Sequence, residues 1–178
     1  ILLKNNYTII KIEQDSHGTK NPKRAVTEII SPGVNLETSN FSNNIMSIYL
    51  EEFNDHKTKQ LILQIGISII DVTTGNNWVY ETHSNPDDYN YCLDEIFRFI
   101  GSFNPAEIII HTLNTSLDKD TIENYLQIHQ YQVHYQIYGD DKYKHLLQNK
   151  FKNKILKNVF SDTGNLNPIE FIHMERMH

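Results

Sequence analysis

The chain has 178 residues, 39% hydrophobic and 21% charged, which predicts a globular protein with one domain and part of another. Its single cysteine, Cys92, excludes an internal disulfide framework, and no apolar run approaches the roughly 20 residues of a membrane-spanning helix. The net charge of −6 argues against a free-standing nucleic-acid binder.

The charge is unevenly distributed. Residues 1–35 carry five Lys/Arg and three acidic residues, and residues 149–178 carry the same numbers of each. Residues 36–148 carry six Lys/Arg and sixteen acidic residues. The acidic middle segment would repel DNA phosphates, whereas both ends could lie near them, so the middle segment is better suited to binding proteins. The alternative is an acidic surface that only maintains solubility. Without a signal-peptide layout or an initiator Met, the chain is expected to be part of a longer, soluble, intracellular protein of undetermined compartment.

A strand over residues 6–14, a basic loop and a second strand over residues 24–34 open the chain, with a stop at Pro32-Gly33. The loop could position DNA phosphates or could simply be solvated. Its basic residues are Lys20, Lys23 and Arg24. Residues 35–44 are polar and lack a periodic apolar face, so we place a domain boundary there and expect it to be sensitive to proteases.

A short strand is expected over residues 45–51, followed by a hairpin. Residues 61–72, LILQIGISIIDV, are apolar on both faces, which is typical of a central strand. Residues 73–77, TTGNN, have turn chemistry, so residues 78–82 are expected to return as the partner strand.

A helix is expected next, with Asn85 as its N-cap and Gly101 at its end. Pro86 would lie in its first turn, and the acidic pair that follows Pro86 would lie near its positive end. Its apolar face is expected to consist of Cys92, Leu93, Ile96, Phe97 and Ile100.

Strands and helices then alternate: a strand over residues 107–111, a helix over 116–129, a strand over 132–138 and a helix over 140–160. The later strand would present Val133, Tyr135 and Ile137 on one face, and the last helix would align Tyr143, Leu147, Phe151 and Ile155. A hairpin followed by this alternation predicts an α/β fold, an RNase H-like mixed sheet flanked by helices.

Four motifs, taken in order, resemble the MutS family of DNA mismatch-repair proteins. Residues 6–14, NYTIIKIEQ, are similar to the family's Gly-Tyr-x-Val-x-x-x-Glu-Gln strand, and residues 24–34, RAVTEIISPGV, to the strand that ends in Thr-Pro-Gly-Thr. Residues 66–75, GISIIDVTTG, resemble its Gly-x-Ala-x-x-Asp-x-Ser/Thr-Thr-Gly, and residues 166–175, LNPIEFIHME, resemble the start of its helical core. The mild departures are Asn6, Ser31 and Val34.

The resemblance covers nearly the whole chain and implies its organisation. Residues 1–36 would end an α/β mismatch-recognition domain, 37–44 would be a linker, 45–160 an RNase H-like connector, and 161–178 the start of the helical core. The connector would be non-catalytic, would link the mismatch-binding domain to the core and ATPase, and would offer a docking surface to MutL-type partners. The parent would be a DNA-dependent ATPase that uses ATP and Mg and binds mismatched duplex DNA as a homodimer or heterodimer.

Two functional signatures of the family are missing from this stretch: the Phe-x-Glu element that wedges beside a mispaired base, and the Gly-x-x-x-x-Gly-Lys-Ser/Thr phosphate loop. Phe53-Asn54-Asp55 resembles the first only superficially. We therefore expect this stretch to bind no cofactor, to hydrolyse no ATP and to bind duplex DNA weakly without preference for mismatches.

A metal-dependent nuclease of RNase H-like fold is the main alternative. Such enzymes hold two metal ions with carboxylates from the first strand, a helix and a later strand. Against it, Asp71 precedes a turn whose amides its side chain can bond, and the strand over 107–111 offers no Asp at its end. We therefore expect no catalytic residue and no metal site, and a plain protein-interaction module is a third possibility. The carboxylates in question are Asp71, Glu81, Asp94 and Glu95.

The remaining candidates are expected to have ordinary roles. His129 and His134 lack metal-ligand spacing and are expected at the surface, and Cys92 is expected in the core. Four aromatic residues are expected to serve the core and its rim: Tyr89, Tyr91, Phe97 and Phe99. Four acidic residues are expected to form the surface where a MutL-type partner docks, since opposite charge would steer the encounter. They are Asp87, Asp88, Asp118 and Asp120.

Overall fold

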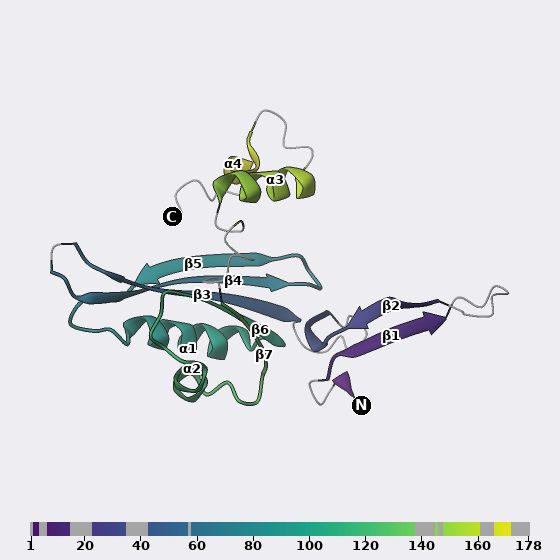
Figure 1. Cartoon of the computed structure of the whole chain (residues 1–178), viewed down its shortest axis with the longest axis horizontal. Helices are drawn as coiled ribbons and strands as arrows, with labels where there is room; N and C mark the ends of the chain where they lie inside the picture. The colour runs from purple at the N-terminus through teal and green to yellow at the C-terminus, as the bar shows by residue number, and fades with distance from the viewer. Residues whose placement is uncertain are drawn as a thin grey trace.

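The computed structural model describes residues 2–3, 7–14, 23–34, 43–56, 58–137, 145, 148–160 and 166–171. Its main unit is a five-stranded mixed sheet in the order β5-β4-β3-β6-β7, and a separate two-stranded sheet holds β1 (Ile9–Gln14) and β2 (Arg24–Ile30). The hairpin of β1 and β2 extends beyond one end of the larger sheet (Figure 1). The predicted α/β class is confirmed as a mixed sheet with helices.

The middle strand of the larger sheet is β3 (Asn44–Asn54), which pairs with β4 in antiparallel and with β6 in parallel orientation. The sequence predicted a short strand over residues 45–51, but the strand has eleven residues. It continues through Glu51 and Glu52 because every residue of β3 lies opposite a residue of β4. The other strands are β4 (Leu61–Asp71), β5 (Asn77–His83), β6 (Glu107–Leu113) and β7 (Gln132–Ile137).

The core lies on one face of this sheet, where side chains from alternate positions of the strands gather under α1 and α2 (Figure 1). Burying each of these side chains contributes about 1.5–3 kcal/mol. The other face of β4 is mixed, because Ser68 and Ile70 are exposed there. The prediction of two apolar faces is therefore right for only one of them. The fully buried strand residues are Met46, Ile48, Leu50, Leu63, Ile65, Ile67, Ile69, Ile108 and Ile110.

The first long helix, α1 (Tyr91–Phe103), begins later than predicted. Asn85 does not cap it; Asn85 and Asp88 instead form an isolated β-bridge in the preceding turn. The helix starts after Asn90, where Asp88 Oδ1 accepts a hydrogen bond from the Tyr91 amide at 3.1 Å. The residues that promote helix starts also promote turns, and here they form a turn.

The end and the inner face of α1 also differ from the prediction. The helix continues through Gly101 because Phe103 packs against Trp78 and Phe99, and it ends at Asn104 with a φ of 41°. Phe97 was expected to point inward but is 44% exposed. The buried residues of α1 are Cys92, Leu93, Ile96 and Ile100.

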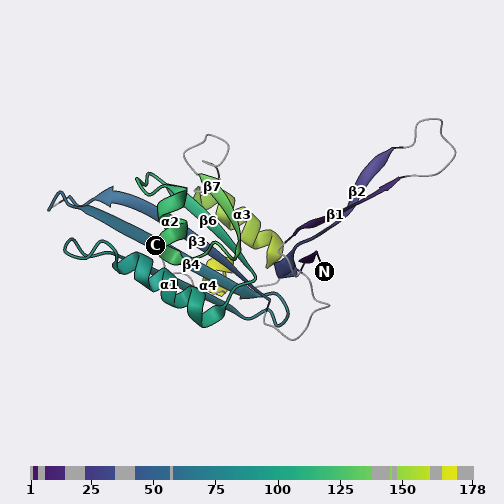
Figure 2. The same cartoon turned by 90° about the horizontal axis from the view of Figure 1, so that it is seen from below.

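Helix α2 (Lys119–Leu126) is shorter than the predicted 116–129, because Asp118 caps its start and Gln127 ends it with a φ of 54°. Within the predicted helix over 140–160, the structure shows α3 (Asn149–Val159), followed by α4 (Pro168–Phe171). Tyr143 and Leu147 lie outside the described residues. No side chain of α3 is buried. Figures 1 and 2 place α3 and α4 on the side of the sheet opposite α1 and α2.

The predicted second strand, over 24–34, ends at Ile30, and a short 3-10 turn, η2 (Pro32–Val34), follows it. Residues 35–42 of the predicted linker lie outside the described residues, and so do most of residues 161–178. The proposed domain boundaries therefore stay predictions.

Candidate functional site

The predicted acidic residues gather at one end of the sheet. Strands β3, β5 and β6 run in the same direction, so their C-terminal ends meet at this end. The loop after β5 carries Asp87 and Asp88, and the loop after β6 carries Asp118 with Asp120 just inside α2. All four residues are exposed. We call them the acidic rim.

A buried carboxylate holds the two loops of the acidic rim together. Glu52, near the end of β3, is 7% exposed and accepts hydrogen bonds from the Ser116 amide at 2.7 Å and the Ser116 hydroxyl at 3.0 Å. The Tyr89 hydroxyl also donates to Glu52. Burial, and then the hydrogen bond to Glu52, raises the pKa of Tyr89 above its ordinary value. Glu52 thus ties the loop before α1 and the loop before α2 to the middle strand.

The sequence analysis missed Glu52. Its signal was present, since Glu52 continues the alternation Met46, Ile48, Leu50 and so occupies a core-facing position. A buried carboxylate needs hydrogen-bond donors. Two loops supply those donors, and their proximity depends on the tertiary fold.

Two members of the acidic rim stabilise helix starts. Asp118 Oδ1 accepts from the Thr121 amide at 2.7 Å, and hydrogen bonding with Thr121 lowers the pKa of the Asp118 carboxyl. Asp88 accepts from the first amide of α1. Asp87 and Asp120 make no hydrogen bond or ion pair to another described residue. These two can therefore be changed without loss of a helix cap.

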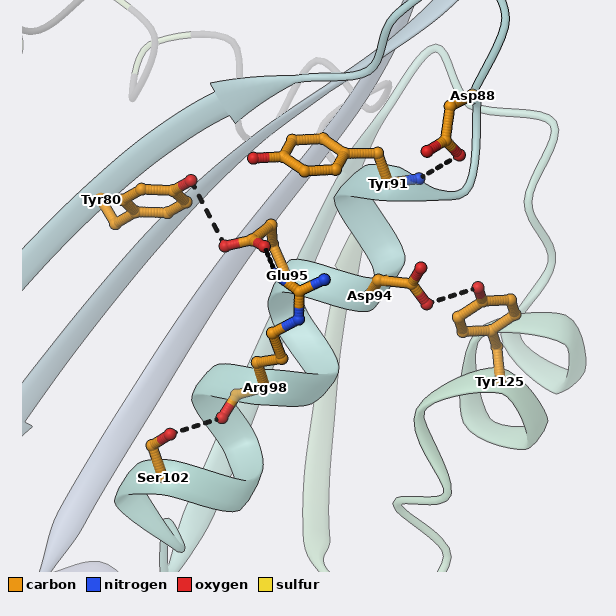
Figure 3. Close-up of polar contacts among 8 residues, drawn as sticks. All are labelled: Tyr80, Asp88, Tyr91, Asp94, Glu95, Arg98, Ser102 and Tyr125. Atoms are coloured by element: carbon orange, nitrogen blue, oxygen red, sulfur yellow. Dashed lines mark hydrogen bonds and ion pairs between the residues drawn. The ribbon is translucent and has the colours of Figure 1, made fainter.

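The outer surface of α1 is tied to its neighbours by polar contacts (Figure 3). The Tyr125 hydroxyl of α2 donates to Asp94 Oδ1 at 2.8 Å, a bond that raises the pKa of Tyr125. Glu95 forms an ion pair with Arg98 and accepts from the Tyr80 hydroxyl of β5 at 3.4 Å. Two of the carboxylates considered for a nuclease are therefore engaged with protein groups.

The other two nuclease candidates lie apart. Asp71 Oδ1 accepts from the Thr73 amide at 2.9 Å and Asp71 Oδ2 from the Thr74 hydroxyl at 2.8 Å, which confirms the predicted turn role and lowers the pKa of Asp71. Glu81 lies opposite Gly66, five residues from Asp71 along β4, or about 17 Å at the rise of a strand. Within the described parts of the chain, no three His, Cys, Asp or Glu residues are grouped to hold a metal ion.

The DNA-backbone candidates lie on the hairpin. Lys23 and Arg24 are exposed, with Arg24 opposite Gln14 in the register of β1 and β2, and Lys20 lies outside the described residues. One face of the hairpin exposes four apolar side chains, because Ile10 lies opposite Ile29 and Ile12 lies opposite Val26.

The hairpin joins the sheet through Gly33 in η2. The Gly33 amide donates to Glu107 Oε1 at 2.7 Å, and Glu107 is 6% exposed. A Cβ atom at Gly33 would lie 2.9 Å from Ile45 Cγ1, so only glycine fits without displacement of that side chain. Gln132 Nε2 of β7 also donates to Thr8 Oγ1 at 2.8 Å.

The remaining predicted roles can be placed. Cys92 is fully buried, its Sγ donates to the Leu63 carbonyl at 3.2 Å, and burial raises the pKa of the thiol to about 12. His129 and His134 are at the surface, as predicted, although His134 Nε2 lies 3.6 Å from Glu107. Of the four aromatic residues, Tyr89, Tyr91 and Phe99 are partly buried against the core, whereas Phe97 is exposed. None of the described helices is long and apolar enough to cross a membrane.

Three curated proteins are similar to this chain. A MutS-homologue DNA mismatch repair protein of Acanthamoeba polyphaga mimivirus is 29% identical over 99% of this chain and 17% of its own length. MutS of Lachnoclostridium phytofermentans is 32% identical over 60% of this chain and 10% of its own length. MutS of Flavobacterium psychrophilum is 27% identical over 76% of this chain and 14% of its own length. The chain thus spans less than a fifth of each relative. These similarities support membership of the MutS family.

No family model matches the chain. Among solved structures, a chain from the simian T-cell lymphotropic virus intasome in complex with PP2A regulatory subunit B56 gamma aligns with 78% of this chain and 50% of that one. Its TM-score is 0.36 at 15% sequence identity, a likeness that carries no weight for fold or function.

Proposed function

We propose that this chain is a non-catalytic segment of a MutS-type DNA mismatch repair protein, in which the five-stranded sheet serves as an RNase H-like connector. The observation that carries the proposal is the similarity to a mismatch repair protein along 99% of the chain. In the parent, the segment would join the mismatch-recognition domain to the helical core, and ATP and Mg would be used elsewhere. The parent would act on mismatched duplex DNA as a dimer.

The joint at Gly33 supports a connecting role. A connector that relays the position of one domain to another needs a stiff joint, because a loose tether transmits no orientation. The hydrogen bond from Gly33 to Glu107 is buried, and the contact with Ile45 leaves no space for a side chain. The bond between Thr8 and Gln132 adds a second attachment point. The hairpin is thus held to β6 and β7 at two places.

The acidic rim supports the docking part of the proposal. Asp87 lies on the loop before α1 and Asp120 in the first turn of α2, and Glu52 bonds the loop before each helix, so both charges are presented on a fixed surface. Charges of this kind act mainly by steering the encounter with an oppositely charged partner, which raises the association rate. A basic surface on a MutL-type protein is the complement that we propose.

The nuclease alternative has less support. It needs carboxylates that converge on metal ions about 4 Å apart. Asp94 and Glu95 instead bond Tyr125 and Arg98, and Asp71 bonds its own turn. Metal-dependent cleavage of nucleic acid by this chain, abolished by Asp71→Asn, would overturn the non-catalytic proposal.

The docking proposal is tested in the full-length parent with Asp87→Lys and Asp120→Lys combined. We expect a roughly tenfold slower association with the MutL-type partner at low salt and a weaker salt dependence of that rate. Asp88 and Asp118 are left intact because they bond helix amides. Glu13→Lys combined with Glu28→Lys makes the same charge change on the hairpin and serves as the matched control. Equal association rates for both double variants would sink the docking proposal.

A further inference from the structure

Helix α3 is basic and has no carboxylate partner among the described residues. Its eleven residues, NKFKNKILKNV, include four lysines and no acid, and all four lysines are exposed. Elsewhere, Lys11, Arg98 and Lys119 each form an ion pair with a glutamate. No lysine of α3 forms one with any residue that the structure describes. The helix thus presents four positive charges that the described protein does not neutralise.

The lysines of α3 are ordered around the helix. Lys150, Lys154 and Lys157 follow the spacing i, i+4, i+7, so they form one stripe about 10 Å long. Phe151, Ile155, Leu156 and Val159 lie on the other side of the helix, and Lys152 lies between Val159 and Leu156 around the helix axis. We call Lys150, Lys154 and Lys157 the lysine stripe.

Helix α3 lies away from the acidic rim, although Glu51 and Glu81 share its side of the sheet. Figures 1 and 2 place it on the side of the sheet opposite α1 and α2, and the acidic rim lies at the starts of those two helices. Two layer spacings of about 10 Å each separate these helices from α3, because the sheet lies between them. The screening length at physiological salt is about 8 Å, so the acidic rim repels a polyanion near α3 only weakly. The overall charge of −6 therefore does not describe the surface that such a partner would meet.

We propose that the lysine stripe of α3 contacts the phosphate backbone of duplex DNA without reading its sequence. The inference rests on the proposed function, which is what brings duplex DNA to the protein. Lysines on one edge of a helix can neutralise successive phosphates and release their counterions. An anionic membrane fits less well, because insertion of the apolar side would bury Lys152 among Ile155, Leu156 and Val159.

The test measures binding of the 178-residue chain to a fluorescein-labelled, fully paired 30-base-pair duplex by anisotropy between 50 and 200 mM salt. Lys150→Gln, Lys154→Gln and Lys157→Gln are combined, since Gln keeps helix propensity and circular dichroism can verify the helix. We expect weak binding by the original chain and at least a roughly tenfold loss in the triple variant at 50 mM salt. The slope of log K against log salt should fall in magnitude by about 2–3, or 0.9 for each lost phosphate contact.

A matched pair of single variants sharpens the test. Lys154→Gln should weaken binding and reduce the slope by about one contact, whereas Lys152→Gln removes the same charge from the other side of the helix and should have less than half that effect. Equal effects of the two variants would mean that net charge, and not the stripe, sets affinity. Equal binding by the triple variant and the original chain would also overturn the inference.

Two further measurements separate the possible explanations. Vesicles with 30% phosphatidylserine replace the duplex, and binding to vesicles alone that depends on the stripe would assign the stripe to membranes and overturn the inference. The docking experiment on Asp87 and Asp120 does not involve α3. If the triple variant binds DNA like the original chain while the Asp87 and Asp120 variant slows partner association, this inference is overturned and the proposed function stands. If the lysine stripe is needed for DNA binding but the Asp87 and Asp120 variant leaves partner association unchanged, the inference stands and the docking part of the proposed function is overturned.

Discussion

Helices α1 and α3 have similar apolar spacing but opposite surroundings. Each aligns apolar residues along one side, yet α1 buries Cys92, Leu93, Ile96 and Ile100, whereas α3 buries none. The difference lies in what the helix faces. Helix α1 covers the isoleucine-rich face of β3 and β4, and α3 lies on the side where β4 presents Ser68 and the exposed Ile70. Amphipathic spacing therefore predicts a helix, but the opposing surface decides whether it becomes core.

The polar residues of the two helices differ in the same way. Around α1, Asp94 and Glu95 are used to bond α2, β5 and Arg98 (Figure 3). The lysines of α3 have no such partners among the described residues. A helix whose charges are satisfied internally serves the fold, and one whose charges are not satisfied is available to a ligand. The following predictions test this contrast.

The largest effect is expected when the same truncation is made in both helices. Ile96→Ala should lower the free energy of unfolding by about 3–4 kcal/mol, because it leaves a cavity in a closed core. Ile155→Ala, at a residue that is 45% exposed, should lower it by less than about 1 kcal/mol. Urea unfolding followed by circular dichroism measures both values. Similar losses would show that α3 packs as tightly as α1.

The next largest effect should come from the loops that precede α1 and α2. Glu52→Ala should cost about 2–3 kcal/mol, because the Ser116 amide and the Tyr89 hydroxyl lose their acceptor in a buried site. Glu51→Ala is the control, since Glu51 is half-buried and accepts a hydrogen bond from the Tyr49 hydroxyl at 2.8 Å, and it should cost less than about 1 kcal/mol. Equal losses in equilibrium unfolding would exclude a special role for Glu52.

A pH dependence is expected from Cys92 in α1. Its pKa is raised to about 12 in the folded protein, whereas an exposed thiol titrates near 8.5–9. The unfolded state therefore loses this proton first, and stability falls as pH rises above about 9 by roughly 1.4 kcal/mol per pH unit. The partly buried Tyr89 and Tyr135, whose pKa values burial raises, add to the decline above pH 10. Unfolding of the original chain and of Cys92→Ala between pH 7 and 10.5 should show a shallower decline in the variant, and parallel curves would contradict the prediction.

The smallest effect should come from the start of α3. Gln148 has the extended backbone of an N-cap but its side chain makes no capping hydrogen bond, unlike Asp118 before α2. Gln148→Ser should stabilise α3 by about 0.5–1 kcal/mol. Hydrogen exchange of the α3 amides measures the gain, and Gln148→Ala is the control. A serine variant without added protection would mean that α3 is already held by contacts other than its own caps.

Strands were easier to predict than helix limits. The hairpin of β4 and β5 and the strands β6 and β7 were predicted because short runs of β-branched residues between turns favour strands over helices. The start of α1 was wrong because Asn85 and Pro86 suit a helix start and a turn equally. The length of β3 was wrong because two adjacent glutamates resemble the end of a strand, while one of them is buried in a network.

The acidic rim was only partly accessible from sequence. Asp87 and Asp120 could be named as exposed charges, but the meeting of their loops depends on parallel pairing between β3 and β6. The capping role of Asp118 was hidden because the predicted helix began at residue 116 instead of 119. Asp71 was predicted correctly, because its hydrogen bonds are made within three residues of the chain.

The two partners of β3 differ greatly in sequence distance, which has a consequence for folding. Asn54 pairs with Leu61, seven residues later, whereas Ile45 pairs with Glu107, 62 residues later. A hairpin forms in about 1–10 μs, but the parallel partner must first be synthesised. At about 5–20 residues per second, some 60 residues take roughly 3–12 s. During that interval one edge of β3 has unpaired backbone groups next to Met46, Ile48 and Leu50, so the nascent chain is most prone to associate with other chains before β6 is added.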